Sequence, residues 1–177
     1  ESHHTFDLLY NNTSDVKPDI LSTDTHGANR YNFAILHFFG YQFAPRYKTF
    51  KDHFEKFFQV ESTEDTEQLI TMRVPIDWEL ITLEWENICR LMISLGQHKT
   101  SQSVLIKKLC RYKSNTATLK ALAEYDRAIK AQYILDYIDS ETLRRHVQRA
   151  LNRGEAFHQL RRVIAKTNGK KFRGSHH

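Results

Sequence analysis

Cysteine, proline and glycine are scarce in this sequence, and each shortage excludes a class of protein. Two cysteines, Cys89 and Cys110, among 177 residues cannot build a disulfide framework or a zinc site. Three prolines and six glycines are too few for a turn-rich sandwich or barrel and favour helices. The longest apolar stretch, residues 31–41, is interrupted by polar residues and is too short to span a bilayer. Because no secretory signal opens the sequence, we expect a soluble protein from a reducing compartment.

The charge is small overall but very unevenly distributed. The net charge is +5, yet residues 52–86 carry ten acidic and two basic side chains, and residues 144–173 carry ten basic and one acidic. A basic segment of that density is typical of a protein with a polyanionic partner such as nucleic acid, although a solvated basic helix has the same composition. The single acid among these bases is Glu155, and its isolation there favours a functional role.

The first part of the chain predicts a small β-α-β unit. Residues 20–23 read as a short strand that ends at Asp24, residues 28–39 have a helical pattern that ends at Gly40, and residues 41–44 alternate as a second strand. Such an order within about 25 residues implies two parallel strands. Two parallel strands alone are not a stable sheet, so the unit either packs on helices as a marginal ribbon or is completed by strands outside this chain.

The rest of the chain is predicted to be helical, without a third strand. The expected helices are 77–95 with Asp77 as its cap, 101–112, 116–138, one that Ser140 caps, and 155–167, which Gly154 separates from it. Trp78, Trp85 and Val104 fall on apolar stripes and are predicted to be core residues. The fold class is therefore mainly α with a small β-α-β element.

Asp24 is a candidate for chemistry, because functional groups in open α/β sheets lie beyond the carboxyl ends of the strands. Its carboxylate can hold a hard cation there, and Gly27 allows a tight turn of the backbone. The alternative is that Asp24 only caps the following helix or stabilises a turn. The histidines show no His-x-x-x-His pair and are interpreted as structural or surface residues.

Glu155 is the second candidate, at the start of the last predicted helix. Helical spacing places three polar residues on its face: Gln159, Arg162 and Lys166. It places three apolar residues on the opposite face: Phe157, Leu160 and Ile164. We therefore expect the apolar face to dock on a core while Glu155 and the bases face a common partner. The alternative is an ordinary surface glutamate near a helix N-terminus.

Three short motifs occur in order along the chain: Ser22-Thr23-Asp24-Thr25-His26-Gly27, Phe43-Ala44-Pro45-Arg46 and Leu151-Asn152-Arg153-Gly154-Glu155-Ala156. With these motifs the sequence resembles the C-terminal catalytic region of Tn-three-family transposases, large bacterial enzymes that move replicative transposons. Residues 103–109 and 121–138 are similar in character to the helical insert of that family. The resemblance covers residues 1–173, and residues 174–177 read as the remnant of a purification tag.

The resemblance implies a partial ribonuclease-H-like fold with a D-D-E set of carboxylates. Asp24 matches the second aspartate and Glu155 matches the glutamate, while the first aspartate and its strand are expected upstream of Glu1. The resemblance also implies three parts of the chain: a partial ribonuclease-H-like core (1–59), a helical insertion (60–150) and a helix that returns to the core (151–173).

The family's chemistry is metal-dependent DNA strand cleavage followed by strand transfer of the freed 3′-hydroxyl. The resemblance implies two Mg²⁺ ions, or Mn²⁺ as a substitute, bound by Asp24, Glu155 and the missing aspartate. It also implies phosphate contacts, for which the candidate residues are Arg46, Arg153, Arg162 and Lys166. The full-length enzyme is expected to self-associate and to act on transposon ends and target DNA at the bacterial nucleoid, in the cytoplasm. Without its first aspartate, this chain alone is expected to be inactive.

Two other functions stay open at this stage. One is a non-catalytic helical nucleic-acid-binding module that uses residues 144–173 as its footprint. The other is a helical protein-interaction scaffold whose acidic segment 52–86 pairs with a basic partner.

Overall fold

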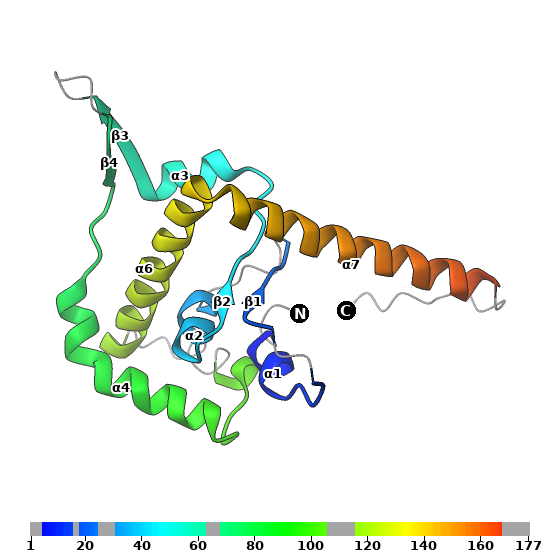
Figure 1. Ribbon diagram of the computed structural model, residues 1–177. Coiled ribbons are helices and arrows are strands. Elements are labelled where there is room, and N and C mark those ends of the chain that lie inside the picture. Colours follow the sequence, from blue (N-terminus) through cyan, green and yellow to red (C-terminus); the bar gives the residue numbers. More distant parts are fainter. Residues whose placement is uncertain (1–4, 16–17, 25–30, 63–67, 106–115, 168–177) are drawn as a thin grey trace.

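The computed structural model describes residues 5–15, 18–24, 31–62, 68–105 and 116–167. Its helices are α1 (Thr5–Tyr10), α2 (Asn32–Phe38), α3 (Phe50–Phe57), α4 (Trp78–Gly96), α6 (Ala117–Asp139) and α7 (Glu141–Thr167). Its strands are β1 (Ile20–Leu21), β2 (Gln42–Phe43), β3 (Phe58–Ser62) and β4 (Gln68–Met72), which form two separate two-stranded sheets. The longer helices α4, α6 and α7 surround α2, β1 and β2 (Figure 1). No helix in these residues is long and apolar enough to cross a membrane.

The predicted parallel β-α-β unit is present. β1 pairs in parallel with β2, and α2 connects them. The helix ends at Gly40, whose φ of 80° is left-handed and suits a residue without a side chain. Two backbone hydrogen bonds close this end, from the Gly40 N–H to the His37 carbonyl (3.0 Å) and from the Tyr41 N–H to the Leu36 carbonyl (2.9 Å). The predicted start of the helix, residues 28–30, lies outside the described residues.

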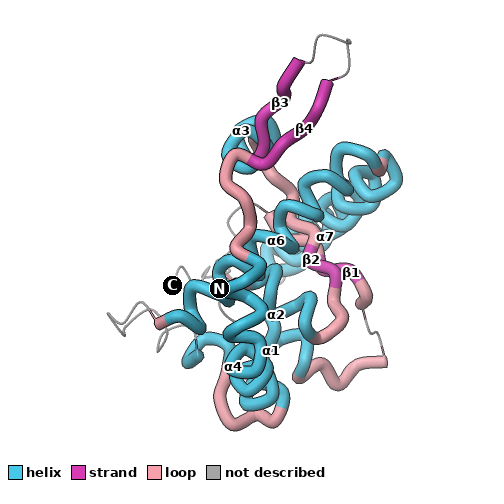
Figure 2. The backbone as a smooth tube through the Cα atoms, turned by 90° about the vertical axis from the view of Figure 1, so that its left-hand side faces the viewer, coloured by secondary structure: helices cyan, strands magenta, loops and turns pink. Residues whose placement is uncertain are grey.

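The prediction that no further strand follows β2 is wrong. β3 and β4 form an antiparallel hairpin in which Val60 lies opposite Ile70, and this hairpin projects from the rest of the molecule (Figure 1, Figure 2). Apolar residues alternate along it, with Phe58 and Val60 on one strand and Ile70 and Met72 on the other. Leu69, next to Ile70, interrupts this alternation, so the pattern is weak in the sequence. The segment predicted as a helical insertion therefore contains a β-hairpin.

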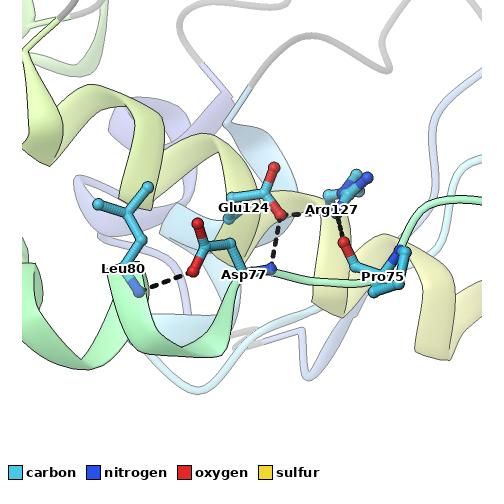
Figure 3. A network of polar contacts seen from close by, with 5 residues as sticks. All are labelled: Pro75, Asp77, Leu80, Glu124 and Arg127. Carbon is cyan, nitrogen blue, oxygen red and sulfur yellow. Dashed lines mark hydrogen bonds and ion pairs between the residues drawn. The ribbon is translucent and has the colours of Figure 1, made fainter.

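α4 and α6 pack against each other and supply much of the core. As predicted, Asp77 caps α4, because its carboxylate accepts a hydrogen bond from the Leu80 N–H (2.9 Å). The Glu124 carboxylate of α6 accepts hydrogen bonds from the Asp77 N–H (3.1 Å) and the Arg127 guanidinium (2.6 Å), so the start of α4 is tied to α6 (Figure 3). The side chains that these two helices bury completely in the core include Ile88, Met92, Leu122 and Ile134.

The two tryptophans of α4 are not core residues, contrary to the prediction. The side chains of Trp78 and Trp85 are 62% and 40% exposed, whereas Ile88 is fully buried. The tryptophans lie on the edge of the apolar stripe, because the side of α4 that meets α6 is centred nearer Ile88. Val104, which was also predicted to point inward, is exposed. Most of its predicted helix, residues 106–112, lies outside the described residues.

α7 is one continuous helix, so the predicted break at Gly154 is wrong. A glycine inside a helix costs about 1 kcal/mol relative to alanine, which is too little to interrupt a helix of 27 residues. The first turns bury Leu143 and Val147, whereas Phe157 and Leu160 further along are exposed. The expectation that this apolar face docks on the core is therefore wrong for the described residues, because α7 extends beyond the core (Figure 1).

Candidate active site

Asp24 lies directly beyond the carboxyl end of the parallel strand pair. The pairing continues past β1 and β2 through hydrogen bonds from the Ala44 N–H to the Leu21 carbonyl and from the Arg46 N–H to the Thr23 carbonyl, both 2.8 Å. Arg46 is therefore held beside Thr23, and the next residue is Asp24, whose side chain is exposed. The structure thus brings the backbones of two predicted site residues, Asp24 and Arg46, close together.

The segment after β2, which carries Arg46, is supported from α6. The Tyr133 hydroxyl donates a hydrogen bond to the Pro45 carbonyl (2.7 Å), and the Tyr133 side chain is only 4% exposed. Burial raises the pKa of the Tyr133 hydroxyl, so the group remains a neutral donor. α6 is therefore bonded directly to the motif Phe43-Ala44-Pro45-Arg46.

α6 also holds the N-terminus of α2, through Asp126. Its carboxylate accepts hydrogen bonds from the N–H groups of Ala34 (3.0 Å), Tyr31 and Phe33, which are donors near a helix start where intrahelical partners are lacking. Tyr31 has a left-handed backbone (φ 71°), which is unfavourable for a bulky side chain, and the bond to Asp126 helps to hold it. Burial raises the pKa of Asp126 from 3.8 to about 6, although the N–H groups and the nearby Lys130 favour the ionised form.

The raised pKa of Asp126 predicts a pH dependence of folding stability. Between about pH 4 and about pH 6 the folded chain binds a proton at Asp126 that the unfolded chain does not. The stability that this protonation contributes is therefore fully present below about pH 4 and is lost as the pH rises through about 6. The change corresponds to about 3 kcal/mol. Asp126→Asn removes the titration, so its free energy of unfolding should improve relative to wild type as the pH rises from about 4 to about 7.

Urea denaturation of this chain at several pH values measures the effect. Asp139→Asn, which changes an exposed acid on the same helix, is the matched control and should follow wild type within about 0.5 kcal/mol at each pH. If the difference in free energy of unfolding between Asp126→Asn and wild type stays constant with pH, burying the ionised Asp126 does not destabilise the folded chain.

The other predicted site residues lie on α7. Glu155, Arg153, Arg162 and Lys166 are all exposed. Glu155 and Arg162 border the same surface depression, as expected for residues seven apart on a helix. Arg153 lies on the other side of the helix. In Figure 1, α7 passes near the end of the parallel pair from which the chain leaves β2 for α3.

The donor type of these side chains fits a hard divalent cation. Carboxylate oxygens such as those of Asp24 and Glu155 are the ligands that Mg²⁺ prefers. In the part of the chain that the structure describes, no group of three or more His, Cys, Asp and Glu side chains lies close enough to hold a metal ion.

Two residues that bond to the segments near Asp24 and Arg46 were missed from the sequence, Asp126 and Tyr133. Asp126 stands between Leu122 and Ile129 at helical spacing, so it lies on the apolar side of α6. An acid in that position indicates a buried acceptor that must find donors, because an unpaired buried carboxylate is costly. The sequence thus held a signal for Asp126, but none for its partners on α2.

Comparison with known proteins identifies relatives over the whole chain. The model of the family described as Tn3 transposase DDE domain matches residues 1–177. The transposase for transposon Tn1546 of Enterococcus faecium is 33% identical over 162 residues, 91% of this chain and 16% of that protein. The transposase for Tn2501 of Escherichia coli is 32% identical over 166 residues, 93% of this chain and 16% of that protein. No solved structure matches the chain.

The family model and these relatives agree on the class of protein, a transposase domain. The chain belongs to the Tn3 transposase DDE domain family, which confirms the resemblance drawn from the three motifs. This is a family of DNA transposases, for which divalent metal ions and DNA are the general requirements. The chain spans only 16% of the length of the relatives described above.

Proposed function

We propose that this chain is the part of a transposase catalytic domain that supplies Asp24 and Glu155 to the D-D-E set. The full-length enzyme then cleaves DNA strands and transfers the freed 3′-hydroxyl to target DNA in replicative transposition. The observation that carries this proposal is the exposed Asp24 beyond the carboxyl end of a parallel strand pair, which is where functional groups gather in parallel sheets. The exposed Glu155 on a basic helix supports it.

The acids and the bases have different tasks in this proposal. Asp24 and Glu155 supply carboxylate oxygens to Mg²⁺ or Mn²⁺, with two ions in the complete site. Such a pair of ions stabilises the attacking and leaving oxygens of an in-line displacement at phosphorus. Arg162 and Lys166, on the Glu155 face of α7, and Arg46, beside Asp24, hold backbone phosphates without reading bases.

The proposal includes an organisation of the chain and of the enzyme. Residues 1–59 form a partial ribonuclease-H-like core, residues 60–150 an insertion that contains most of the β3–β4 hairpin, and residues 151–173 the segment that carries Glu155, whose described part extends α7 beyond the core of this chain. The full-length enzyme self-associates and works at the bacterial nucleoid. Because the carboxylate set has three members and two are assigned here, we expect no cleavage by this chain alone with Mg²⁺ or Mn²⁺.

This chain is expected to bind duplex DNA weakly and without sequence preference. The affinity should fall steeply with salt, because binding to phosphates releases counterions. Replacing Arg46, Arg162 and Lys166 together with Gln should reduce the slope of log K against log salt by up to about 3, if each contacts one phosphate. Fluorescence anisotropy with duplexes of unrelated sequence, at salt concentrations from about 50 to about 200 mM, measures both the affinity and the slope.

A matched triple variant separates a DNA-binding face from a general effect of charge. Lys51→Gln, Arg90→Gln and Lys120→Gln remove three exposed bases from α3, α4 and α6, and together they should leave the slope nearly unchanged. No binding at low salt would favour the scaffold, with the acidic segment 52–86 as its interface. Binding by this chain without transposon-end cleavage by the full-length protein would favour a non-catalytic nucleic-acid-binding module.

A further inference from the structure

We infer that Tyr133 of α6 is a positioning residue for Asp24, an inference that rests on the proposed role of Asp24 as a metal ligand. Two hydrogen bonds and two peptide bonds, Pro45–Arg46 and Thr23–Asp24, join the two residues. The Tyr133 hydroxyl donates to the Pro45 carbonyl (2.7 Å), the Arg46 N–H donates to the Thr23 carbonyl (2.8 Å), and Asp24 follows Thr23 in the chain. A side chain of the insertion is thereby connected to the acid at the strand end.

The direction of the Pro45 carbonyl explains why this bond is needed. The N–H groups of Ala44 and Arg46 point to β1, and alternate residues of a strand direct their backbone groups to opposite edges. The Pro45 carbonyl therefore points to the outer edge of β2, where no strand is paired in the described sheet. Pro45 is fully buried, so its carbonyl needs a donor from another element. Tyr133 supplies that donor.

α6 supports the other side of Asp24 as well. Asp126, two turns before Tyr133 on the same side of α6, binds the start of α2 through the N–H groups of Tyr31, Phe33 and Ala34. α2 is the next described element after Asp24. α6 is therefore hydrogen-bonded to the segment after β2, which pairs with the residue before Asp24, and to the start of α2, the next described element after Asp24. A shift of α6 would move the segment that holds Thr23.

The first test measures hydrogen exchange in this chain. Tyr133→Phe keeps the ring and removes the donor, so exchange at the Arg46 amide should become about fivefold faster, as expected for the loss of one hydrogen bond. Tyr137→Phe is the matched control, because it removes a hydroxyl one turn further along α6 while its ring stays stacked on Phe50. That control should leave Arg46 exchange unchanged. Equal rates in the two variants would overturn the inference.

The second test uses the full-length transposase. Tyr133→Phe should raise the metal concentration for half-maximal strand cleavage about fivefold and leave the DNA Kd unchanged. A purely structural role would lower Tm and speed exchange at all core amides without moving the metal midpoint, which would overturn the inference. If Tyr133→Phe fails to fold, Tyr133→Met, which also lacks the donor but is an adaptable apolar side chain, is measured in the same way, and an unmoved midpoint there overturns the inference.

The two proposals fail in different ways. If the full-length Asp24→Asn enzyme cleaves DNA as well as wild type, the assignment of Asp24 as a metal ligand fails, whatever Tyr133 does. If Asp24→Asn is inactive while Tyr133→Phe changes neither Arg46 exchange nor the metal midpoint, the proposed function stands and the positioning role of Tyr133 is lost.

Discussion

Asp24→Asn and Glu155→Gln, each made in the full-length transposase, are expected to lower strand cleavage and strand transfer by about a thousandfold or more. Metal ions contribute several kcal/mol to phosphoryl displacement, and each loss of about 1.4 kcal/mol costs a factor of ten in rate. DNA affinity should stay close to wild type, because an amide replaces a carboxylate without removing a basic residue. Gel assays of end cleavage and of strand-transfer products, beside an anisotropy titration, measure the three quantities.

Two exposed acids provide matched controls. Asp19→Asn changes an acid that precedes β1, and Glu141→Gln changes an acid in the first turn of α7. Both should keep activity within about twofold of wild type, because substitutions of exposed residues have small effects and the exposed ion pair of Glu141 with Arg145 contributes little. If Asp24→Asn or Glu155→Gln behaves like its control, that acid is not part of the carboxylate set.

Gln102→Leu should lower the free energy of unfolding of this chain by about 2 to 4 kcal/mol. The Gln102 side chain is fully buried. Its carbonyl oxygen accepts a hydrogen bond from the Phe6 N–H (2.7 Å), and its amide donates to the Asn32 side-chain oxygen (2.6 Å). Leucine fills the same space but takes away the acceptor of one buried group and the donor of another. Urea denaturation of the wild type and the variant measures the loss.

Gln132→Leu is the control for this substitution. Gln132 is exposed on α6, and its amide donates a hydrogen bond to the half-buried Asp136. Its replacement should change the free energy of unfolding by no more than about 0.5 kcal/mol. A Gln102→Leu variant as stable as this control would show that the link from Gln102 to α1 and α2 contributes little to folding.

Local patterns were sufficient to predict the elements that neighbouring residues decide. Gly40 ends α2 and Asp77 caps α4, as expected, because a left-handed turn and an N-cap each depend on a few adjacent groups. The hairpin was missed because Leu69 interrupts the alternation of its apolar residues, such as Val60 and Ile70. Gly154 was given too much weight, since one glycine costs less than a long helix gains from its neighbours.

Burial could not be read from periodicity in the same way. Trp78 and Trp85 lie on the apolar stripe of α4 but at its edge, and only the direction from which α6 approaches decides which side chains are covered. Asp126 and Tyr133 were missed for a related reason. Their partners on α2 and β2 are about 90 residues away in the chain, and no local pattern connects them.

The amino-acid order by itself determined the family of this protein, through three short motifs, and the β-α-β unit that carries Asp24. Each motif and the β-α-β unit consist of residues close together in the chain. Backbone geometry and residue type therefore leave few alternative local structures. Only the tertiary structure decided that α6 bonds to the segment after β2 and to the start of α2, and that the outer part of α7 extends beyond the core. Those outcomes depend on how distant helices pack, which is set by the combined fit of many side chains.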